Sequence, residues 1–554
     1  MIDFAKDDAL YFLPLGGTGE IGMNLNLYGH AGAWLMVDLG VTFADERQPG
    51  VELLMADPAF ITERRDQLCG LVLTHAHEDH IGAVPHLWPR LRCPIYATPF
   101  TAAVLRGKLV EAGLEREAEI TEVPMSGRFS VGPFALELVT LTHSIPEPNA
   151  LVIRTAAGTV LHTGDWKLDP DPMLGESYDE AALRALAGEG VLAMVCDSTN
   201  ALVDGESGSE SEVFESLMQL LGTLKNRVAV TCFASNVARL RTVMRIAEAH
   251  GRRVALVGRG MRRIHQAAVE TGYLGGLAPL ISEKDVGFLP REEVLILCTG
   301  SQGEQRAALW RIARDDHPHL VFEEGDAVIF SSRVIPGNEV GIFELENHLA
   351  HKGIRVIGDG HWRTHVSGHP ARDELTQMYQ WVRPKIAIPV HGEPRHLVEH
   401  ADLARECQVP QALVAENGSL IRLAGGSAEI VGHVTSGRLA LDGNRLIAAD
   451  SPIIRERRKL SFSGSAVAML VVDAGGSLLA EPRLSTEGVI DPEHEADVLE
   501  QAMAVIEGAV RNLPKAARRD DDRLGEAVRV ALRRAFNQLV GKKPSTKVEV
   551  LRLP

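Results

Sequence analysis

The chain has 554 residues, of which 45% are hydrophobic and 24% charged. This length is too great for one hydrophobic core and predicts three or four domains. The formal net charge of −17 excludes a protein that coats nucleic acid by bulk electrostatic attraction. Any polyanionic ligand must be held by a local basic surface or by metal ions, and the basic spots at 259–263, 455–459 and 515–519 are solvated faces by default.

The N-terminal sequence and the cysteines indicate a cytoplasmic protein. Residues 1–12 lack the basic and apolar regions of a signal peptide, and no run approaches about 18 consecutive apolar residues. The six cysteines include no CxxC pair. We therefore expect buried thiols rather than disulfides or zinc ligands, and no membrane-spanning helix.

Residues 10–40 form three apolar runs punctuated by glycine, which predict strands joined by tight turns. GGTGEIG, at 16–22, superficially resembles a dinucleotide-binding fingerprint. The segment that follows it is another strand-like run, so no helix is available to receive a phosphate. Asp38 follows the third run, and we expect it to support a neighbouring ligand.

The strongest functional signal lies at 71–82, LVLTHAHEDHIG, where a short apolar run ends in His75, His77, Asp79 and His80. An unpaired polar group inside a protein costs about 1 to 3 kcal/mol, so a buried strand cannot use this much polarity, whereas metal ions can. Zinc takes imidazole nitrogens and carboxylate oxygens. The spacing suits a loop that leaves a strand and opens a helix; the alternative is a solvated histidine-rich turn.

Two later segments repeat this pattern. A strand at 94–98, a helix at 99–112 and strands near 118–123 and 134–140 are predicted, and the last strand leads into His143. A further strand, TVLHTGD, ends at Asp165. Alone, these would be a loop histidine and a turn aspartate. After HAHEDH, they are the expected continuation of one metal site.

Between about 205 and 370 the chain alternates helix and strand patterns, which predicts parallel βαβ units and a separate α/β domain. Only afterwards does KIAIPVHGEPRH, at 385–396, supply a strand that ends in His391. The fold that carries the metal ligands is therefore expected to be split by an insertion.

HxHxDH, an isolated histidine and an aspartate that ends a strand together resemble the metallo-β-lactamase superfamily, whose fold is an αββα sandwich. The inserted domain resembles that of the β-CASP nucleases, with Asp197, His369 and His391 at the positions of the three insertion motifs. Over about 1–450 the chain resembles the ribonuclease J family, in the segments GGTGEIGMN, HAHEDHIG, HTGDWKLD, DSTNA, FASN, IPGNE, HVSGH and PVHGEPRH.

The resemblance implies an α/β protein whose sandwich is split by the β-CASP domain and followed by a small C-terminal α+β domain. The expected parts are the first sandwich segment, the β-CASP domain, the second sandwich segment, and a linker with the C-terminal domain, at 1–204, 205–370, 371–450 and 451–554. Helices near 493–512 and 522–540 and a last strand are expected, with an exposed linker or turn at 515–523. In the family this domain supports a homodimer.

The resemblance also implies two zinc ions, with manganese or magnesium as possible replacements. One ion is expected at His75, His77 and His143 and the other at Asp79, His80 and His391, bridged by Asp165. Asp79, Asp197 and His369 are expected to be catalytic, with His369, oriented by Asp197, assisting the leaving oxygen. The alternative is that Asp197 and His369 only pin the domain interface.

The segment HVSGH offers what a terminal phosphate needs: a hydroxyl, a glycine and two histidines. In the family it contacts RNA and helps to recognise a 5′-monophosphate. The expected substrate-binding residues are His365, Val366, Ser367, Gly368 and His369, completed by Ser235 and Asn236.

These features predict a metal-dependent ribonuclease with 5′-to-3′ exonuclease and endonuclease activity, which acts in RNA maturation and mRNA decay. Its partners would be single-stranded RNA with a 5′-monophosphate, a second copy of the chain and RNA-decay proteins. Two alternatives remain open: a small-molecule ester or thioester hydrolase with the same metal site, and a catalytically silent RNA-binding scaffold.

Overall fold

The computed structural model describes residues 8–424, 427–491 and 493–554. The chain forms two compact units: one holds the residues up to Thr42 together with Met55–Gly437, and the other holds Phe43–Leu54 with Arg438–Pro554. The division into domains at 1–204, 205–370, 371–450 and 451–554 stays a prediction from the sequence. Among the described residues, no helix is long and apolar enough to cross a membrane.

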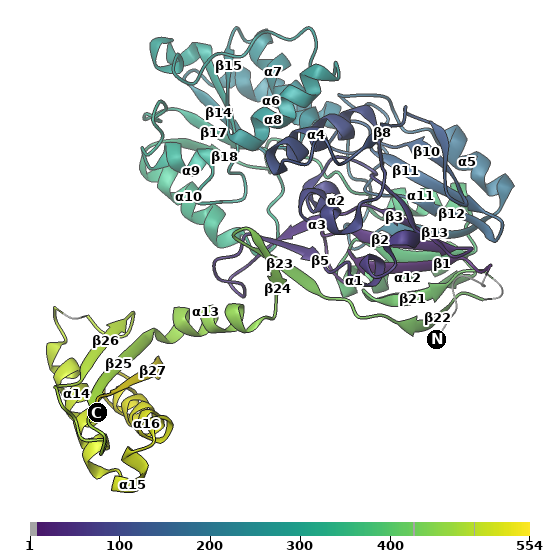
Figure 1. Cartoon of the computed structure of the whole chain (residues 1–554). Helices are drawn as coiled ribbons and strands as arrows, with labels where there is room; N and C mark the ends of the chain where they lie inside the picture. Colours follow the sequence, from purple (N-terminus) through teal and green to yellow (C-terminus); the bar gives the residue numbers. More distant parts are fainter. Residues whose placement is uncertain (1–7, 425–426, 492) are drawn as a thin grey trace. The chain divides into compact units, whose positions relative to one another are not determined.

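The first unit contains the predicted αββα sandwich, which is confirmed (Figure 1). Its two mixed sheets pack their apolar faces together, with Phe12, Leu35 and Val37 of one sheet and Leu138, Leu151 and Ile388 of the other in one buried cluster. The eight-stranded sheet has the order β22-β21-β1-β2-β3-β6-β7-β8. Its strands are β1 (Tyr11–Gly16), β2 (Leu25–His30), β3 (Ala33–Val37), β6 (Leu68–Val72), β7 (Ile95–Ala97), β8 (Ile120–Glu122), β21 (Ser419–Arg422) and β22 (Glu429–His433).

The second sheet of the sandwich has seven strands in the order β20-β19-β13-β12-β11-β10-β9. These are β9 (Arg128–Val131), β10 (Phe134–Thr140), β11 (Asn149–Thr155), β12 (Gly158–His162), β13 (Val191–Asp197), β19 (Ile386–Val390) and β20 (Gln411–Ala412). Its other face packs on α5 and α11 through Leu183, Leu186, Leu375 and Met378. The helices of the sandwich are α1 (Ala59–Thr62), α2 (Glu78–Ile81), α3 (Val84–Leu91), α4 (Pro99–Ala112), α5 (Glu180–Glu189), α11 (Arg372–Val382) and α12 (Pro394–Glu406).

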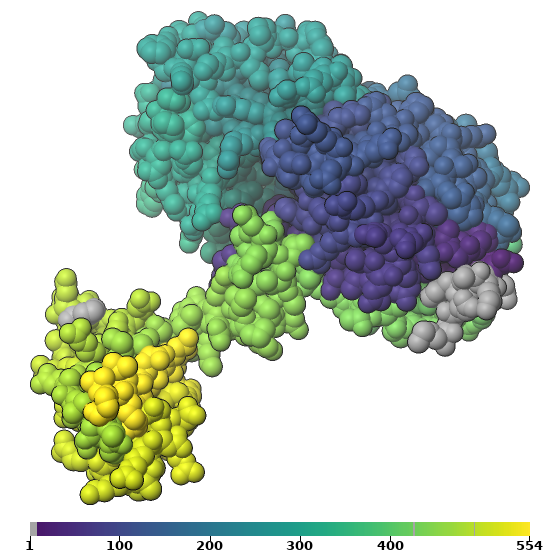
Figure 2. Space-filling model, viewed as in Figure 1, coloured from purple at the N-terminus to yellow at the C-terminus, as the bar shows by residue number. Residues whose placement is uncertain are grey.

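The predicted parallel α/β insertion is confirmed between β13 and β19. Its five strands are all parallel, in the order β15-β16-β14-β17-β18. Helices α6 and α7 cover one face and α9 and α10 the other. The elements are β14 (Val228–Thr231), β15 (Arg253–Val257), β16 (Val294–Cys298), β17 (Ala327–Phe330), β18 (Arg355–Ile357), α6 (Glu210–Thr223), α7 (Val237–Ala249), α8 (Arg259–Glu270), α9 (Ala308–Ala313) and α10 (Glu339–His351). In Figure 2 the teal surface of this insertion lies against the blue surface of the sandwich.

The second unit contains a three-stranded sheet, β26-β25-β27, together with β23, β24 and the parts of β4 and β5 within Phe43–Leu54, which belong to a four-stranded sheet of order β24-β23-β5-β4. The segment after residue 450, where a linker is predicted, contains a 12-residue helix, and the segment 515–523, where a linker or turn is predicted, includes a four-residue helix. The elements are β4 (Val41–Phe43), β5 (Leu53–Ala56), β23 (Arg438–Asp442), β24 (Arg445–Ala448), α13 (Pro452–Ser463), β25 (Ser465–Val472), β26 (Arg483–Glu487), α14 (Ala496–Asn512), α15 (Lys515–Arg518), α16 (Asp521–Leu539) and β27 (Ser545–Arg552).

Three neighbouring strands of the seven-stranded sheet position the site. β12, β13 and β19 lie side by side and parallel, although about 190 residues separate the last two in the chain. Asp197 is opposite Val390 in the register. Because parallel strands end at the same edge of a sheet, Asp165, Asp197 and His391 arrive together.

Candidate metal centre and active site

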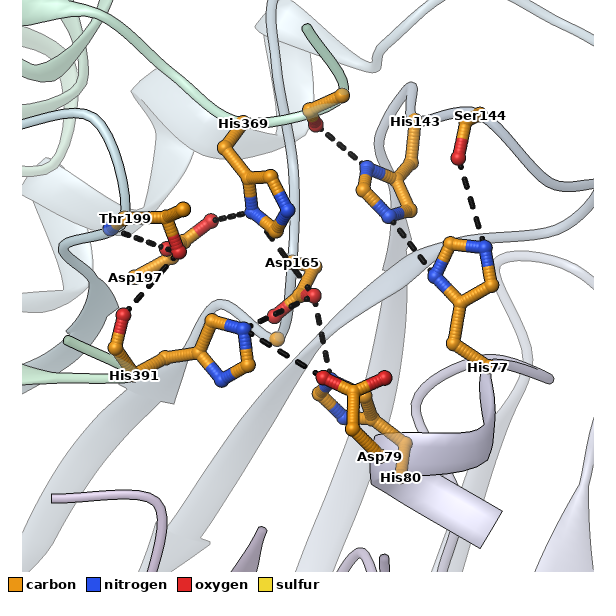
Figure 3. A network of polar contacts seen from close by, with 12 residues as sticks. His77, Asp79, His80, His143, Ser144, Asp165, Asp197, Thr199, His369 and His391 are labelled. Carbon is orange, nitrogen blue, oxygen red and sulfur yellow. Dashed lines mark hydrogen bonds and ion pairs between the residues drawn. The ribbon is translucent and has the colours of Figure 1, made fainter. Parts of the chain in front are cut away.

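The HAHEDH segment connects β6, which ends at Val72, to the short helix α2. His77 takes the position before the first helical residue, so the chain turns through the four candidate ligands. Figure 3 shows His77, Asp79 and His80 facing Asp165, His143 and His391, which come from other segments. All seven predicted metal ligands therefore lie in one cluster.

One set of donors comprises His75, His77, His143 and Asp165, whose ligand atoms lie within 4.8 Å of one another. His77 Nδ1 lies 3.1 Å from both His75 Nε2 and His143 Nε2. His75 Nε2 is 3.9 Å from Asp165 Oδ2. Three imidazoles and a carboxylate match the donors that zinc takes.

A second set comprises Asp79, His80, Asp165 and His391. Asp165 Oδ2 lies 3.2 Å from His80 Nε2 and 3.4 Å from His391 Nε2. His391 Nε2 is buried and has no hydrogen-bond partner among the described residues. An orphaned nitrogen between two carboxylates fits a metal ligand, because such an atom is otherwise costly to bury.

Burial sets the protonation of the first set. It lowers the pKa of His77 to about 4 and that of His75 and His143 well below its ordinary value. These imidazoles are therefore neutral at pH 7 and keep a lone pair for a metal.

The second set has the opposite balance. Burial also opposes the charged form of His80, but Asp165, Asp79 and Asp38 outweigh it and raise the pKa of His80 well above its ordinary value. The proton on His80 compensates the buried carboxylates, and we expect metal binding to displace it.

Residues outside the predicted ligand set hold the ligands in place. Asp38 accepts hydrogen bonds from Thr74 N and Oγ1, at 2.8 and 2.9 Å, and lies 2.7 Å from His80 Nδ1. Asn24 Oδ1 lies 3.0 Å from His391 Nδ1. Asp38 and His391 adopt φ angles of 63° and 53°, which are strained for residues other than glycine. The motif GGTGEIGMN contains Asn24, but nothing in its spacing indicated this role.

Asp197 and His369 form the predicted pair. Asp197 Oδ2 lies 2.7 Å from His369 Nδ1, and its Oδ1 accepts hydrogen bonds from Thr199 N and Oγ1 at 2.8 and 2.7 Å. Burial opposes the charge on His369, but Asp197 outweighs it and raises the pKa of His369 to about 9. The ring is thus held through Nδ1, and Nε2 remains for a ligand.

The HVSGH segment lies beside this pair. Ser367 Oγ accepts hydrogen bonds from Asn200 Nδ2 at 2.7 Å and from His369 N at 3.2 Å, so its own proton is left to donate. The side chain of Val366 packs in the hydrophobic core of the insertion. The expectation that Val366 takes part in substrate binding stays a prediction, and a role there would fall to its backbone.

The remaining residues of the expected pocket, His365, Asn236 and Ser235, differ in their surroundings. His365 Nδ1 is buried and has no hydrogen-bond partner among the described residues. Burial, then the charges of Arg239, Lys167 and Arg333, lower the pKa of His365 to about 3. Asn236 Oδ1 already accepts a hydrogen bond from Arg239 N at the start of α7, which is a structural role, whereas Ser235 is half-buried.

Gly368 brings the HVSGH segment into contact with His143. Its carbonyl oxygen lies 2.5 Å from His143 Nδ1. A Cβ at this position would lie 2.6 Å from the His143 ring. The loop that carries His143 and the HVSGH segment are therefore in direct contact here, and only glycine fits at this position.

Four family models match the chain in order. They describe a beta-lactamase superfamily domain at 34–190, a ribonuclease J beta-CASP domain at 225–349, a Zn-dependent metallo-hydrolase RNA specificity domain at 353–410 and a ribonuclease J C-terminal domain at 452–553.

Similar proteins match over nearly the whole chain. A ribonuclease J of Sinorhizobium meliloti is 47% identical over 100% of this chain and 99% of its own. A ribonuclease J of Thermus thermophilus is 36% identical over 98% and 91%, and a ribonuclease J 1 of Streptococcus pyogenes 36% over 91% of both. A crystal structure of a protein of unknown function from Enterococcus faecalis, 18% identical, covers 75% of this chain and 100% of its own with a TM-score of 0.52, which indicates a shared fold.

Replacing Gly368 with alanine tests the contact between the HVSGH segment and His143. The new Cβ would meet the His143 ring, so His143 must move away from His77. We expect zinc affinity, measured by competition with a chromophoric chelator, to fall about 10- to 100-fold, as for lost ligand support. Gly188→Ala is the control, since a Cβ there meets nothing within 4 Å. Unchanged affinity in Gly368→Ala would contradict the assignment.

Proposed function

The chain belongs to the ribonuclease J family and is a metal-dependent RNA hydrolase, and from this premise we propose that it cleaves RNA by two-metal hydrolysis, both from the 5′ end and internally. It would act on single-stranded RNA in RNA maturation and mRNA decay, alone or with RNA-decay proteins. Cleavage would leave a 5′-phosphate and a 3′-hydroxyl.

One observation carries this proposal: seven ligand side chains from four chain segments meet with Asp165 at their centre, with neutral imidazoles on one side and the orphaned His391 Nε2 on the other. Zinc fits these donors, and manganese or magnesium are alternatives. When bound, two such ions supply a hydroxide nucleophile near neutral pH and stabilise charge on the phosphoryl oxygens. His75, His77 and His143 would hold one ion, Asp79, His80 and His391 the other, with Asp165 between them.

His369 would serve the leaving oxygen. Asp197 keeps a proton on the imidazole, since it raises the pKa of His369 to about 9, and fixes the ring through Nδ1. The proton on Nε2 can then pass to the departing 3′ oxygen. Asp79, the other residue expected to be catalytic, would act through the metal that it helps to hold.

The HVSGH segment would bind the 5′-monophosphate. Ser367 has a hydroxyl proton to donate, and His365 Nδ1 is without a partner among the described residues. Arg239 is paired with Glu210 and Lys167 with Asp169, whereas Arg333 donates a hydrogen bond to Asn200, a neutral amide. Because the partner of Arg333 is a neutral amide rather than a carboxylate, the positive charge of Arg333 suits a phosphate.

The alternatives are weaker. A small-molecule hydrolase would not need the matched RNA specificity domain at 353–410. A catalytically silent scaffold would be expected to have lost ligands, and all seven positions here converge.

The second unit would form a homodimer through the three-stranded sheet. Alternate residues of β25, such as Ala468 and Leu470, pack under α14 and α16. The opposite face leaves Met469 and Leu551 51% and 59% exposed. Two apolar side chains on an uncovered sheet face suit contact with a second copy.

Replacing His77 with alanine tests the reaction. It removes a donor that lies between His75 and His143, so we expect cleavage of 5′-monophosphate RNA to be abolished while the thermal unfolding midpoint changes little. His433→Ala, at an exposed position of β22, is the matched control. Full metal-dependent activity in His77→Ala would overturn the site assignment.

The pocket is tested with one RNA sequence that carries a 5′-monophosphate, triphosphate or hydroxyl. We expect the monophosphate RNA to be degraded fastest from its 5′ end. Ser367→Ala should remove about 10- to 100-fold of that preference, which corresponds to one hydrogen bond to a charged group. Equal rates for all three ends, with only internal fragments, would exclude the 5′-phosphate pocket.

The sheet face is tested by Met469→Lys combined with Leu551→Lys. Two charges on an apolar contact should prevent association, so sedimentation should give the monomer mass of 60.1 kDa for the variant and twice that for the native chain. Phe288→Lys, which charges another exposed apolar position, should leave the dimer intact. A native chain that sediments as a monomer would refute this interface.

A further inference from the structure

The loop that carries His143 contains a strained residue that the reaction does not use. Glu147 has a φ angle of 58°, in the left-handed region, and is only 7% exposed. Such a backbone conformation costs about 1 to 3 kcal/mol in a residue other than glycine, so surrounding contacts must maintain it. Pro146 and Pro148 flank it. Because proline fixes φ, a displacement of Glu147 is passed along the loop rather than absorbed.

The contacts that maintain Glu147 are made by its carboxylate. Oε2 accepts a hydrogen bond from Phe100 N at 2.8 Å, in the first turn of α4. Oε1 accepts a hydrogen bond from the Tyr273 hydroxyl at 2.9 Å. Among the described residues, no lysine, arginine or histidine pairs with this carboxylate. Its burial therefore depends on these two donors and on the partial positive charge at the start of α4.

The donor Tyr273 belongs to the inserted domain, just after α8. Burial, and then the charge of Glu147, raise the pKa of Tyr273, so the hydroxyl keeps its proton and donates. The edge of its ring faces Phe100, with the centroids 6.0 Å apart. The tyrosine thus bridges from the insertion to the base of a sandwich loop.

The other end of the same loop also meets the insertion. His143 Nδ1 lies 2.5 Å from the Gly368 carbonyl, and His143 Nε2 faces His77. The loop is therefore held by the inserted domain at both His143 and Glu147. Asn149, which follows the loop, donates a hydrogen bond to Glu147 O at 2.6 Å, and its backbone N–H donates one to Thr74 O, beside His75.

We propose that Tyr273 is a positioning residue for the metal centre: its hydroxyl holds Glu147 in the strained conformation that places His143 beside His77. The inference rests on the proposed metal site. It makes the seating of the inserted domain, whose Tyr273 lies 130 residues after His143 in the sequence, a condition for complete ligation. When the hydroxyl is absent, Oε1 loses its partner, Glu147 turns toward water, and the loop relaxes away from His77.

Tyr273→Phe tests this role, because it keeps the ring and removes the hydroxyl alone. With Co²⁺ as the metal, we expect an altered visible spectrum and about 10-fold weaker binding of one of two ions, the size typical of lost ligand support. For a short RNA, kcat should fall by a similar factor, with KM unchanged. Amide hydrogen exchange in 143–149 should be faster.

Two controls separate positioning from general structural effects. Tyr96→Phe makes the same chemical change in the sandwich, away from Glu147, where the ring stacks on Phe129. Arg263→Met breaks the ion pair with Glu111, which joins α8 to α4, but leaves Glu147 untouched. Both should keep the native cobalt spectrum and kcat.

The outcomes are distinct. A native cobalt spectrum and native kcat in Tyr273→Phe would overturn the inference, as would an equal loss in Arg263→Met, which would assign the effect to domain cohesion. A lower unfolding temperature with an unchanged spectrum would show a purely structural contact and overturn it as well. Failure of the native chain to bind Co²⁺ would instead overturn the proposed function itself.

Discussion

The side-by-side pairing of β12, β13 and β19 is the constraint on which the site depends. These strands deliver Asp165, Asp197 and His391 to one edge of the sheet, because parallel strands end together. The insertion leaves after β13 and returns before β19 without disturbing the register between them. Since both strands remain neighbours, a whole domain can be added while the ligands keep their places.

The same edge concentrates charge that apolar packing cannot tolerate. Asp165 and Asp79 are surrounded by imidazoles, three of which burial keeps neutral, so the compensating charge falls on His80. Asp38 and Asn24 then fix the two histidines of this half through their Nδ1 atoms. The carboxylates are thus balanced by a proton on His80, which a metal cation can replace. The surrounding sandwich core keeps the side chains in place.

The fold and the grouping of the seven candidate ligands could be predicted because each segment that carries them gives a local signal. HAHEDH places four candidate ligands within six residues, and alternating strand and helix patterns predict the parallel insertion. Contacts made across long sequence separations gave no such signal. Asn24 is 367 residues from His391, and Glu147 is 126 residues from Tyr273.

Charge was also hard to predict from sequence alone. The basic spot at 259–263 looks free in the sequence, but Arg262 and Arg263 are paired with Glu283 and Glu111 in the structure. The position of Val366 was equally hard to predict. It belongs to the HVSGH motif, yet its side chain packs in the hydrophobic core of the insertion. Segment-level prediction cannot separate such residues from their neighbours, because the choice depends on which way each side chain points.

The pairing of early with late strands has a consequence for biosynthesis. β1 pairs with β21, and the last ligand, His391, follows β19, so neither the first sheet nor the metal centre can close on a short nascent chain. At about 5 to 20 residues per second, the ribosome needs roughly 20 to 80 s to reach His391. Throughout that time the messenger RNA being translated lies next to a nuclease that is still incomplete.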